Sequence, residues 1–153
     1  MRQIVVAFGS NLGDRRTQIL AAAEQVASFL SGFRLSPIIE TAPAGAGTEH
    51  DPPYLNAVGV GESALAPDEI LERLKAIEAA AGRTRPYPNA PRTLDLDLIL
   101  SGNEILDTGE VQVPHPRFRE RRFVLEPLAA VAPDRRDPVT GLTMRDLLAR
   151  LGG

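Results

Sequence analysis

The segment Leu94-Asp95-Leu96-Asp97-Leu98-Ile99-Leu100 alternates apolar and acidic residues over its first five positions. Successive side chains of a β-strand point to opposite faces of the sheet, so the alternation predicts a strand whose core face carries Leu94, Leu96, Leu98 and Leu100. Asp95 and Asp97 then share the other face, with Cα atoms roughly 6.5 Å apart at about 3.3 Å per residue. The segment predicts a strand with one apolar and one acidic face.

The acidic face indicates a metal site. Aspartate is a poor strand former, and two carboxylates on one face repel each other. A divalent cation removes this conflict, and Mg²⁺ commonly takes one or two carboxylates while phosphate oxygens complete its shell. We therefore predict Asp95 and Asp97 as Mg²⁺ ligands. The alternative is a solvated outer face on which the carboxylates pair with arginines.

The rest of the chain supplies the partners of this strand. Apolar runs predict further strands at 3–8, 33–41 and 54–62. A first helix begins after the capping residue Asp14, with Ile19, Leu20, Ala23, Val26, Ala27 and Leu30 on its apolar face, and a second runs from Pro67 to Gly82. The order is βαββαβ, which predicts an α+β fold of the ferredoxin-like sandwich type.

Beyond residue 100 the sequence predicts a C-terminal extension of hairpin and helices. Residues 104–113 form the expected hairpin, 123–131 are apolar, and Thr143 caps a last helix. The pattern contains no internal repeat or linker, so we expect a single domain over 1–153. Two proline-containing segments without periodicity, 42–53 and 83–91, flank the acidic strand or its neighbours. Loops of this length commonly bind or cover substrates.

Composition excludes several classes of protein. The chain has 153 residues, no cysteine and a net charge of −3, which excludes a disulfide scaffold and a thiolate metal site and disfavours nucleic acid as a partner. No apolar stretch approaches the roughly 20 residues that a membrane span requires. We expect a cytoplasmic protein that binds no membrane and acts as a monomer.

Arginine is unevenly placed along the chain. Of the 17 basic residues only Lys75 is a lysine, and 7 arginines against 6 acidic residues lie between Arg83 and Arg122. Arginine forks match phosphate oxygens, and cations beside a carboxylate metal site are what phosphoryl transfer requires. The alternative is a genome rich in G and C, with residues such as Arg119 and Arg122 merely at the surface.

Two smaller motifs have both structural and functional interpretations. His115, between prolines, is either a structural histidine or a hydrogen-bond donor to phosphate. Tyr54 and Asn56 begin the strand after the first loop, and their spacing places them on one face. An amide beside an aromatic ring suits the edge of a heteroaromatic ligand, whereas the alternative is ordinary packing at a strand start.

Together these motifs resemble the 6-hydroxymethyl-7,8-dihydropterin pyrophosphokinase family over nearly the whole chain. The matching elements are Gly9-Ser10-Asn11-Leu12-Gly13, Thr41-Ala42-Pro43-Ala44-Gly45, Tyr54-Leu55-Asn56, Gly82-Arg83-Thr84-Arg85, Arg92-Thr93-Leu94-Asp95-Leu96-Asp97 and Val113-Pro114-His115 with Arg121 and Phe123. The resemblance implies transfer of the pyrophosphoryl group of ATP to the hydroxymethyl oxygen of the pterin, with release of AMP, in folate biosynthesis.

The resemblance also implies roles for individual residues. Asp95 and Asp97 would hold two Mg²⁺ ions and, with Arg83 and Arg92, form the catalytic set. ATP would be bound by Glu78, Arg83, Arg85, Arg92, Leu98, His115 and Arg121. The pterin would lie between Tyr54 and Phe123, hydrogen-bonded by Asn56 and by groups of Thr41, Ala42 and Ala44.

The sequence departs from the family pattern at two places. Pro88 and Asn89 stand where a basic residue and a tryptophan are usual, and Pro116 stands where a tyrosine is common. We expect activity to survive these changes, with weakened binding or slower loop closure. The alternative function is that of a catalytically weakened relative that binds nucleotide or pterin and acts as an interaction module.

Overall fold

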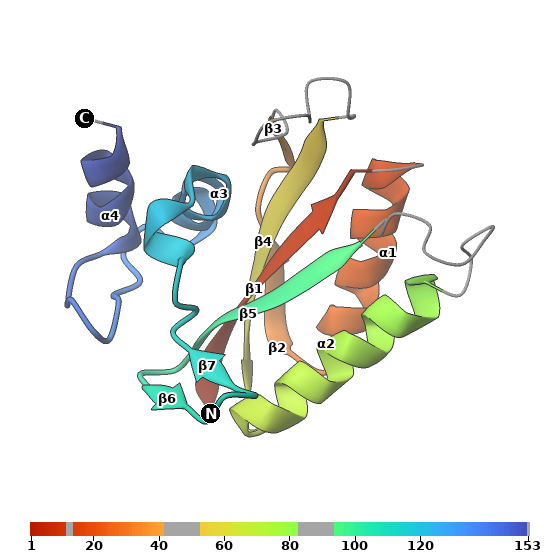
Figure 1. Cartoon of the computed structure of the whole chain (residues 1–153), viewed down its shortest axis with the longest axis horizontal. Helices are drawn as coiled ribbons and strands as arrows, with labels where there is room; N and C mark the ends of the chain where they lie inside the picture. Colours follow the sequence, from red (N-terminus) through yellow and green to blue (C-terminus); the bar gives the residue numbers. More distant parts are fainter. Residues whose placement is uncertain (12–13, 42–52, 83–93, 153) are drawn as a thin grey trace.

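The computed structural model describes residues 1–11, 14–41, 53–82 and 94–152, which form an α+β structure (Figure 1). An antiparallel sheet has the order β2-β4-β1-β5, with a short β3 also paired to β4. Its strands are β1 (Arg2–Ser10), β2 (Ser31–Leu35), β3 (Ile39–Thr41), β4 (Tyr54–Ser63) and β5 (Asp95–Ser101). The α+β class predicted from the sequence is confirmed.

Helices cover both faces of this sheet. One face packs on α1 (Arg15–Ala27) and α2 (Pro67–Gly82), and the other on the 3-10 helix η1 (Phe118–Glu120), α3 (Arg122–Val131) and α4 (Met144–Leu151) (Figure 1). The central strand β1 contributes Ile4, Val6 and Phe8 to the first layer and Val5 to the second. Its continuous apolar run is therefore explained by burial on both sides.

Local signals placed most of the helix ends correctly. The Asp14 side chain accepts a hydrogen bond from the Thr17 amide (3.2 Å), and Thr143 accepts one from the Asp146 amide (3.1 Å), as N-caps do. Helix α1 was expected to reach Leu30, but it ends at Ala27. Leu20, expected on the apolar face, is 43% exposed. The hairpin of β6 (Leu106–Asp107) and β7 (Gln112–Val113) lies within the range predicted for it.

The strand expected at 33–41 is two strands. Between β2 and β3, Ser36 takes over the pairing, since its amide donates to the Val58 carbonyl (2.8 Å) and its hydroxyl accepts from the Val58 amide (2.9 Å). Pro37 follows and has no amide hydrogen for the ladder, which explains the interruption.

The alternation of β5 also breaks. Val5 of β1 pairs with Leu100, whereas Val6 pairs with Leu98, so Ile99 is an extra residue opposite β1. Such a β-bulge shifts the side-chain alternation by one position. Leu100 therefore lies with Val5 in the layer under α3, and its predicted place beside Leu98 is wrong.

A partly buried ion pair joins η1 to the connection between α3 and α4. Arg119 donates from Nε to Oδ2 of Asp137 (2.5 Å) and from Nη2 to Oδ1 (2.8 Å). Asp137 is fully buried and also accepts from the Val139 amide (3.0 Å) and the Thr140 hydroxyl (2.8 Å). The interpretation of Arg119 as a scattered surface arginine is therefore wrong.

Glycine is required where two strands approach closely. A Cβ on Gly61 of β4 would lie 2.8 Å from Cβ of Leu30 and 3.2 Å from the Ser31 carbonyl oxygen, atoms that move only with the backbone. A Cβ on Gly9 of β1 would meet its nearest neighbour, Oδ1 of Asn56, at an ordinary 3.4 Å.

We predict that Gly61→Ala lowers the free energy of unfolding by about 1–3 kcal/mol, because the added methyl overfills the space between β4 and the start of β2. Urea denaturation followed by circular dichroism measures this loss. Gly9→Ala is the matched control and should change the stability by less than about 1 kcal/mol. Equal stability of the two variants would contradict the steric explanation.

Acid should weaken the ion pair between Asp137 and Arg119. Burial raises the pKa of Asp137, but the hydrogen bonds from Arg119, the Val139 amide and the Thr140 hydroxyl outweigh it and bring the pKa to about 2. Since the folded-state pKa lies below the unfolded value, this carboxylate stabilises the fold above pH 4 and loses that effect as the pH falls toward 2.

We therefore expect the stability difference between the wild type and Asp137→Asn to shrink by about 2 kcal/mol between pH 4.5 and pH 2. Urea denaturation of both proteins across this range measures it. A stability difference that stays constant over this range would show that the Asp137 carboxylate has its ordinary pKa in the folded protein.

Candidate active site

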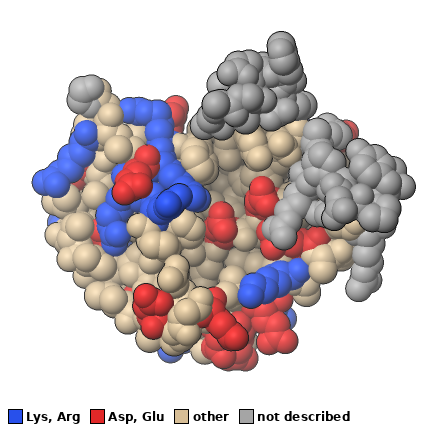
Figure 2. Space-filling view, viewed as in Figure 1, with Lys and Arg blue, Asp and Glu red and all other residues tan. Residues whose placement is uncertain are grey.

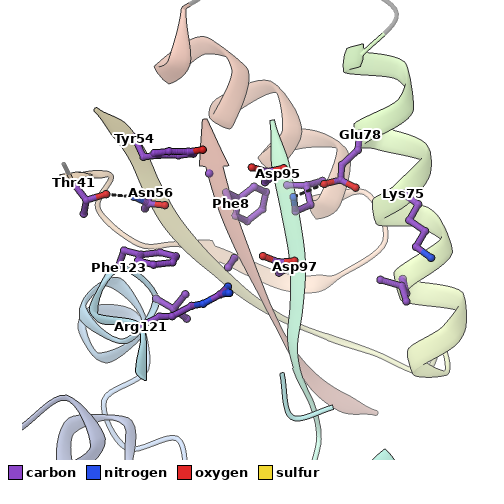
Figure 3. A pocket seen from close by; sticks show the side chains of 15 residues that line it. Phe8, Thr41, Tyr54, Asn56, Lys75, Glu78, Asp95, Asp97, Arg121 and Phe123 are labelled. Atoms are coloured by element: carbon purple, nitrogen blue, oxygen red, sulfur yellow. Dashed lines mark hydrogen bonds between the residues drawn. The ribbon is translucent and has the colours of Figure 1, made fainter. Parts of the chain in front are cut away.

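A cavity of about 590 Å³ opens where the sheet extends beyond the N-terminal end of α3 (Figure 3). Its lining is shared among β1, β3, β4, β5, α2 and the start of α3, and comprises Ala7, Phe8, Gly9, Thr41, Tyr54, Asn56, Leu71, Lys75, Glu78, Asp95, Leu96, Asp97, Arg121, Phe123 and Val124. Figure 2 shows acidic side chains in the hollow and basic side chains gathered over the α3–α4 side of the same face.

Strand register builds the floor of the cavity. Gly9 pairs with Asp95 on one side and with Asn56 on the other, and Ala7 pairs with Asp97 in the next row of the same face. Directly paired residues of an antiparallel sheet point to the same side. Because Gly9 and Ala7 are small, open space separates the carboxylates of β5 from the amide of β4.

Asp95 and Asp97 both line the cavity and are half-buried, while Leu96 and Leu98 between and beyond them are buried in the opposite layer. Their predicted common face is therefore confirmed. Among the residues that the structure describes, no cluster of three or more acidic, histidine or cysteine side chains is arranged to hold a metal ion. A cation at this site would have these two carboxylates as protein ligands and other oxygens from a ligand or water.

An amide and two aromatic rings form the opposite end of the cavity. The Asn56 side chain is buried, and its Nδ2 donates to the Thr41 hydroxyl (2.7 Å), which fixes the plane of the amide. Tyr54 and Phe123 lie on either side of Asn56, with their rings facing the cavity (Figure 3). Phe123 is 39% exposed, which is unusual for a phenylalanine and is expected for one that faces a ligand.

Arg121 connects the aromatic end of the cavity to the carboxylates. Its backbone is extended (φ −106°, ψ 101°) between η1 and α3, and its guanidinium lies 5.6 Å from the ring centre of Phe123. Its side chain points into the cavity toward the side that carries Asp97 (Figure 3). The guanidinium therefore lies beside the ring, on the side of the cavity that faces Asp97.

His115 lies outside the cavity lining, close enough to sense its charges. Burial lowers the pKa of His115, Asp97 acts in the opposite direction, and Arg121 and Arg117 lower the pKa further. The Nδ1 atom accepts a hydrogen bond from the Arg117 amide (3.1 Å), and the His115 amide donates to the Ile99 carbonyl (2.9 Å). The lowered pKa and the hydrogen bond accepted by Nδ1 both favour a neutral imidazole with its proton on Nε2.

Helix α2 forms the remaining wall. Glu78, predicted to bind ATP, accepts a hydrogen bond through Oε2 from the Leu96 amide (2.8 Å) and so attaches the edge of β5 to α2. The Leu98 side chain is buried in the core, so its predicted contact with ATP would have to be made by its backbone.

Leu71 and Lys75 also line the cavity, and neither was predicted from the sequence as a site residue. Two signals were available in the sequence. Leu71, Lys75 and Glu78 follow one another at intervals of one helical turn and so share a helix face, and Lys75 is the single lysine of the chain.

Several predicted site residues lie outside the described part of the chain. These are Ala42, Ala44, Arg83, Arg85 and Arg92. Their roles stay predictions.

The sequence and the fold are similar to those of known proteins. The family model of 7,8-dihydro-6-hydroxymethylpterin-pyrophosphokinase (HPPK) matches residues 5–133. The chain belongs to this family. The HPPK relatives include the 2-amino-4-hydroxy-6-hydroxymethyldihydropteridine pyrophosphokinase of Pseudomonas aeruginosa, which is 41% identical over 152 residues, or 97% of this chain and 91% of the relative. The protein of the same name from Bacillus subtilis is 42% identical over 129 residues, or 82% of this chain and 75% of the relative.

A solved HPPK structure shares the fold. The crystal structure of Plasmodium falciparum HPPK-DHPS wild type matches with a TM-score of 0.73 at 13% sequence identity. The match covers 97% of this chain and 44% of the Plasmodium chain, so the present chain spans less than half of that protein.

We predict that Gly9→Val lowers the kcat/KM of this protein at least about tenfold without unfolding it, because the branched side chain fills the floor between Asp95 and Asn56. Valine is favoured in strands, so the thermal unfolding temperature should stay within a few degrees of the wild type. Steady-state kinetics and thermal denaturation check both points. Gly9→Ala should lose less activity, and equal losses would argue against a floor limited by volume.

Proposed function

We propose that this chain transfers the pyrophosphoryl group of ATP to the hydroxymethyl oxygen of 6-hydroxymethyl-7,8-dihydropterin, with release of AMP, as a step of folate biosynthesis. The observation that carries the proposal is the division of one cavity into two chemically different ends. An oriented amide between two aromatic rings lies at one end, and a carboxylate pair with a guanidinium lies at the other. Membership in the HPPK family supports the same reaction.

The aromatic end suits the pterin. A flat heteroaromatic ring gains from stacking between Tyr54 and Phe123, and its edge carries both donors and acceptors. One Asn56 amide hydrogen is occupied by Thr41. The other hydrogen and the carbonyl oxygen are then directed at the ligand, so the amide reads one orientation of the ring.

The acidic end suits a magnesium–phosphate complex. Asp95 and Asp97 are hard oxygen donors, and a site with two protein carboxylates leaves several coordination positions for phosphate oxygens and water. The donor set therefore fits Mg²⁺, and two ions are the number that the family resemblance implies. When bound, Mg²⁺ would neutralise charge on the phosphate oxygens and favour loss of the proton from the pterin hydroxyl.

The chain's own residues bind and align the phosphates. Arg121 offers a fork of donors to phosphate oxygens from a position fixed by η1 and α3. The neutral His115 offers its Nε2 hydrogen, and Lys75 adds a cation from α2. We propose that Arg83, Arg85 and Arg92 complete this set, so that positioning and charge stabilisation supply most of the rate enhancement.

The finer description of the fold belongs to the same proposal. The order β5-β1-β4-β2, with α1 and α2 on one face, corresponds to a ferredoxin-like βαββαβ unit, and α3 and α4 form an added layer on the other face. We propose that residues 1–153 act as one pterin pyrophosphokinase domain, as a cytoplasmic monomer. None of the helices in the described ranges is long and apolar enough to cross a membrane.

The test is to mix the protein with MgATP and 6-hydroxymethyl-7,8-dihydropterin and to measure AMP. AMP formed only when the pterin is present supports the proposal. Pterin and ATP binding without AMP would indicate instead the weakened relative that binds its ligands as an interaction module. Absence of both pterin and ATP binding would contradict both functions.

We predict that Asp97→Asn lowers kcat by at least about 100-fold, because it removes one ligand of the metal–phosphate complex. The fold should persist, since the change also removes repulsion between Asp95 and Asp97. AMP formation across a Mg²⁺ titration, with circular dichroism of the variant, measures both effects. Asp134→Asn changes a carboxylate that is 81% exposed in the α3–α4 connection, and it should keep wild-type turnover.

A further inference from the structure

Asp137 is the only charged residue among the buried polar residues of the described ranges, and it lies outside the cavity lining. Its carboxylate accepts both donors of the Arg119 fork, together with the Val139 amide and the Thr140 hydroxyl. Its backbone amide also donates to the Leu142 carbonyl (2.8 Å). All these bonds hold Arg119 in one orientation, because a guanidinium bound through two nitrogens cannot rotate.

Arg119 lies two positions before Arg121, which lines the cavity. The Arg121 amide donates to the Phe118 carbonyl (3.2 Å), and the Arg121 carbonyl accepts from the amides of Val124 and Leu125 (3.0 Å each). Phe118 is fully buried under α3, and the Arg119 guanidinium lies 4.7 Å from its ring centre. A rotation of η1 would therefore move Arg121 and the first turn of α3 with it.

The segment has few polar anchors, while Val124 and Leu125 bury the apolar side of α3 in the core. Neither η1 nor α3 has a side-chain hydrogen bond at its N-cap, and the first turn of α3 has no acidic residue to favour its dipole. Phe123 lies in that uncapped first turn and is partly exposed. The Phe118 ring and the Arg119–Asp137 pair hold η1, which immediately precedes Arg121 in the chain.

We infer that the Arg119–Asp137 ion pair is a positioning device that holds Arg121 and Phe123 at the cavity, so that its loss weakens substrate binding while the protein stays folded. The inference rests on the proposed function for the identity of the ligands. Arg119 and Asp137 are positioning residues, because they act through the backbone that carries Arg121 and Phe123.

The experiment compares this pair with an exposed pair in the same region. Arg119→Lys keeps the charge and removes the fork, and Asp137→Asn keeps the shape and removes the charge. The matched controls are Arg145→Lys and Asp134→Asn, since Arg145 and Asp134 form a 2.8 Å ion pair with side chains 60% and 81% exposed. The measurements are the Kd of the pterin by fluorescence in the presence of a non-hydrolysable MgATP analogue, the KM of ATP, and the folded fraction by circular dichroism.

We expect Arg119→Lys and Asp137→Asn to raise the pterin Kd and the KM of ATP about tenfold at a temperature where each variant is folded, as a misplacement of an ångström or less can do. The two controls should stay within twofold of the wild type. A purely structural ion pair would lower the concentration of active protein and leave Kd and KM unchanged, and that result would overturn the inference. Asp137→Asn provides the same test if Arg119→Lys does not fold.

A double-mutant cycle locates the effect. In the Phe123→Ala background, Arg119→Lys should raise the pterin Kd by less than twofold, because the ring that it displaces is already gone. A full tenfold effect in that background would show that Arg119 acts on the pterin by another route and would overturn the inference.

The binding measurement also separates this inference from the proposed function. Wild-type protein that binds the pterin but releases no AMP contradicts the pyrophosphokinase activity, while the Kd comparison still decides the role of the ion pair. Active wild-type protein whose Arg119→Lys variant matches Arg145→Lys contradicts the positioning role alone.

Discussion

The site depends on the absence of side-chain volume at two positions of β1. Ala7 and Gly9 lie between the carboxylates of β5 and the Asn56 amide of β4. On the same face, Val5 comes earlier in the strand and is covered by α3. Larger residues there would extend the core to the end of the sheet and close the cavity. The strand order places the three strands side by side, and the small residues keep their shared face open beyond the end of α3.

The edge position of β5 explains how the acidic face is held. A strand at a sheet edge has one row of backbone groups without a neighbouring strand. Glu78 of α2 accepts from the Leu96 amide, and the His115 amide donates to the Ile99 carbonyl, so groups from two distant parts of the chain bind this edge. The same contacts bring α2 and His115 beside the carboxylates. The contacts that stabilise the edge of the sheet therefore also assemble the site.

Much of this was predictable from local patterns. The period of two in β5 predicted the common face of Asp95 and Asp97, and capping residues predicted the starts of α1 and α4. The bulge at Ile99 was not predictable from periodicity, because it depends on the pairing with β1. The Arg119–Asp137 pair joins residues 18 positions apart, and neither residue type nor spacing indicates such a contact. The proximity of Phe123 to Tyr54 came from the family resemblance, since no local rule brings a helix start to a strand start.

The layer of α3 and α4 both covers the sheet and supplies residues to the cavity, and these two roles are not separable. Val124 and Leu125 of α3 lie in the core under the sheet, while Phe123 and Arg121, adjacent to them in sequence, face the cavity. Because one helical turn serves both surfaces, a small rotation of α3 that improved its packing would move the ring and the guanidinium away from the ligand. A polar anchor with fixed geometry resists such rotation better than apolar contacts, which are nearly indifferent to direction. This difference gives a physical reason for a buried charge in a layer that apolar residues alone would hold together.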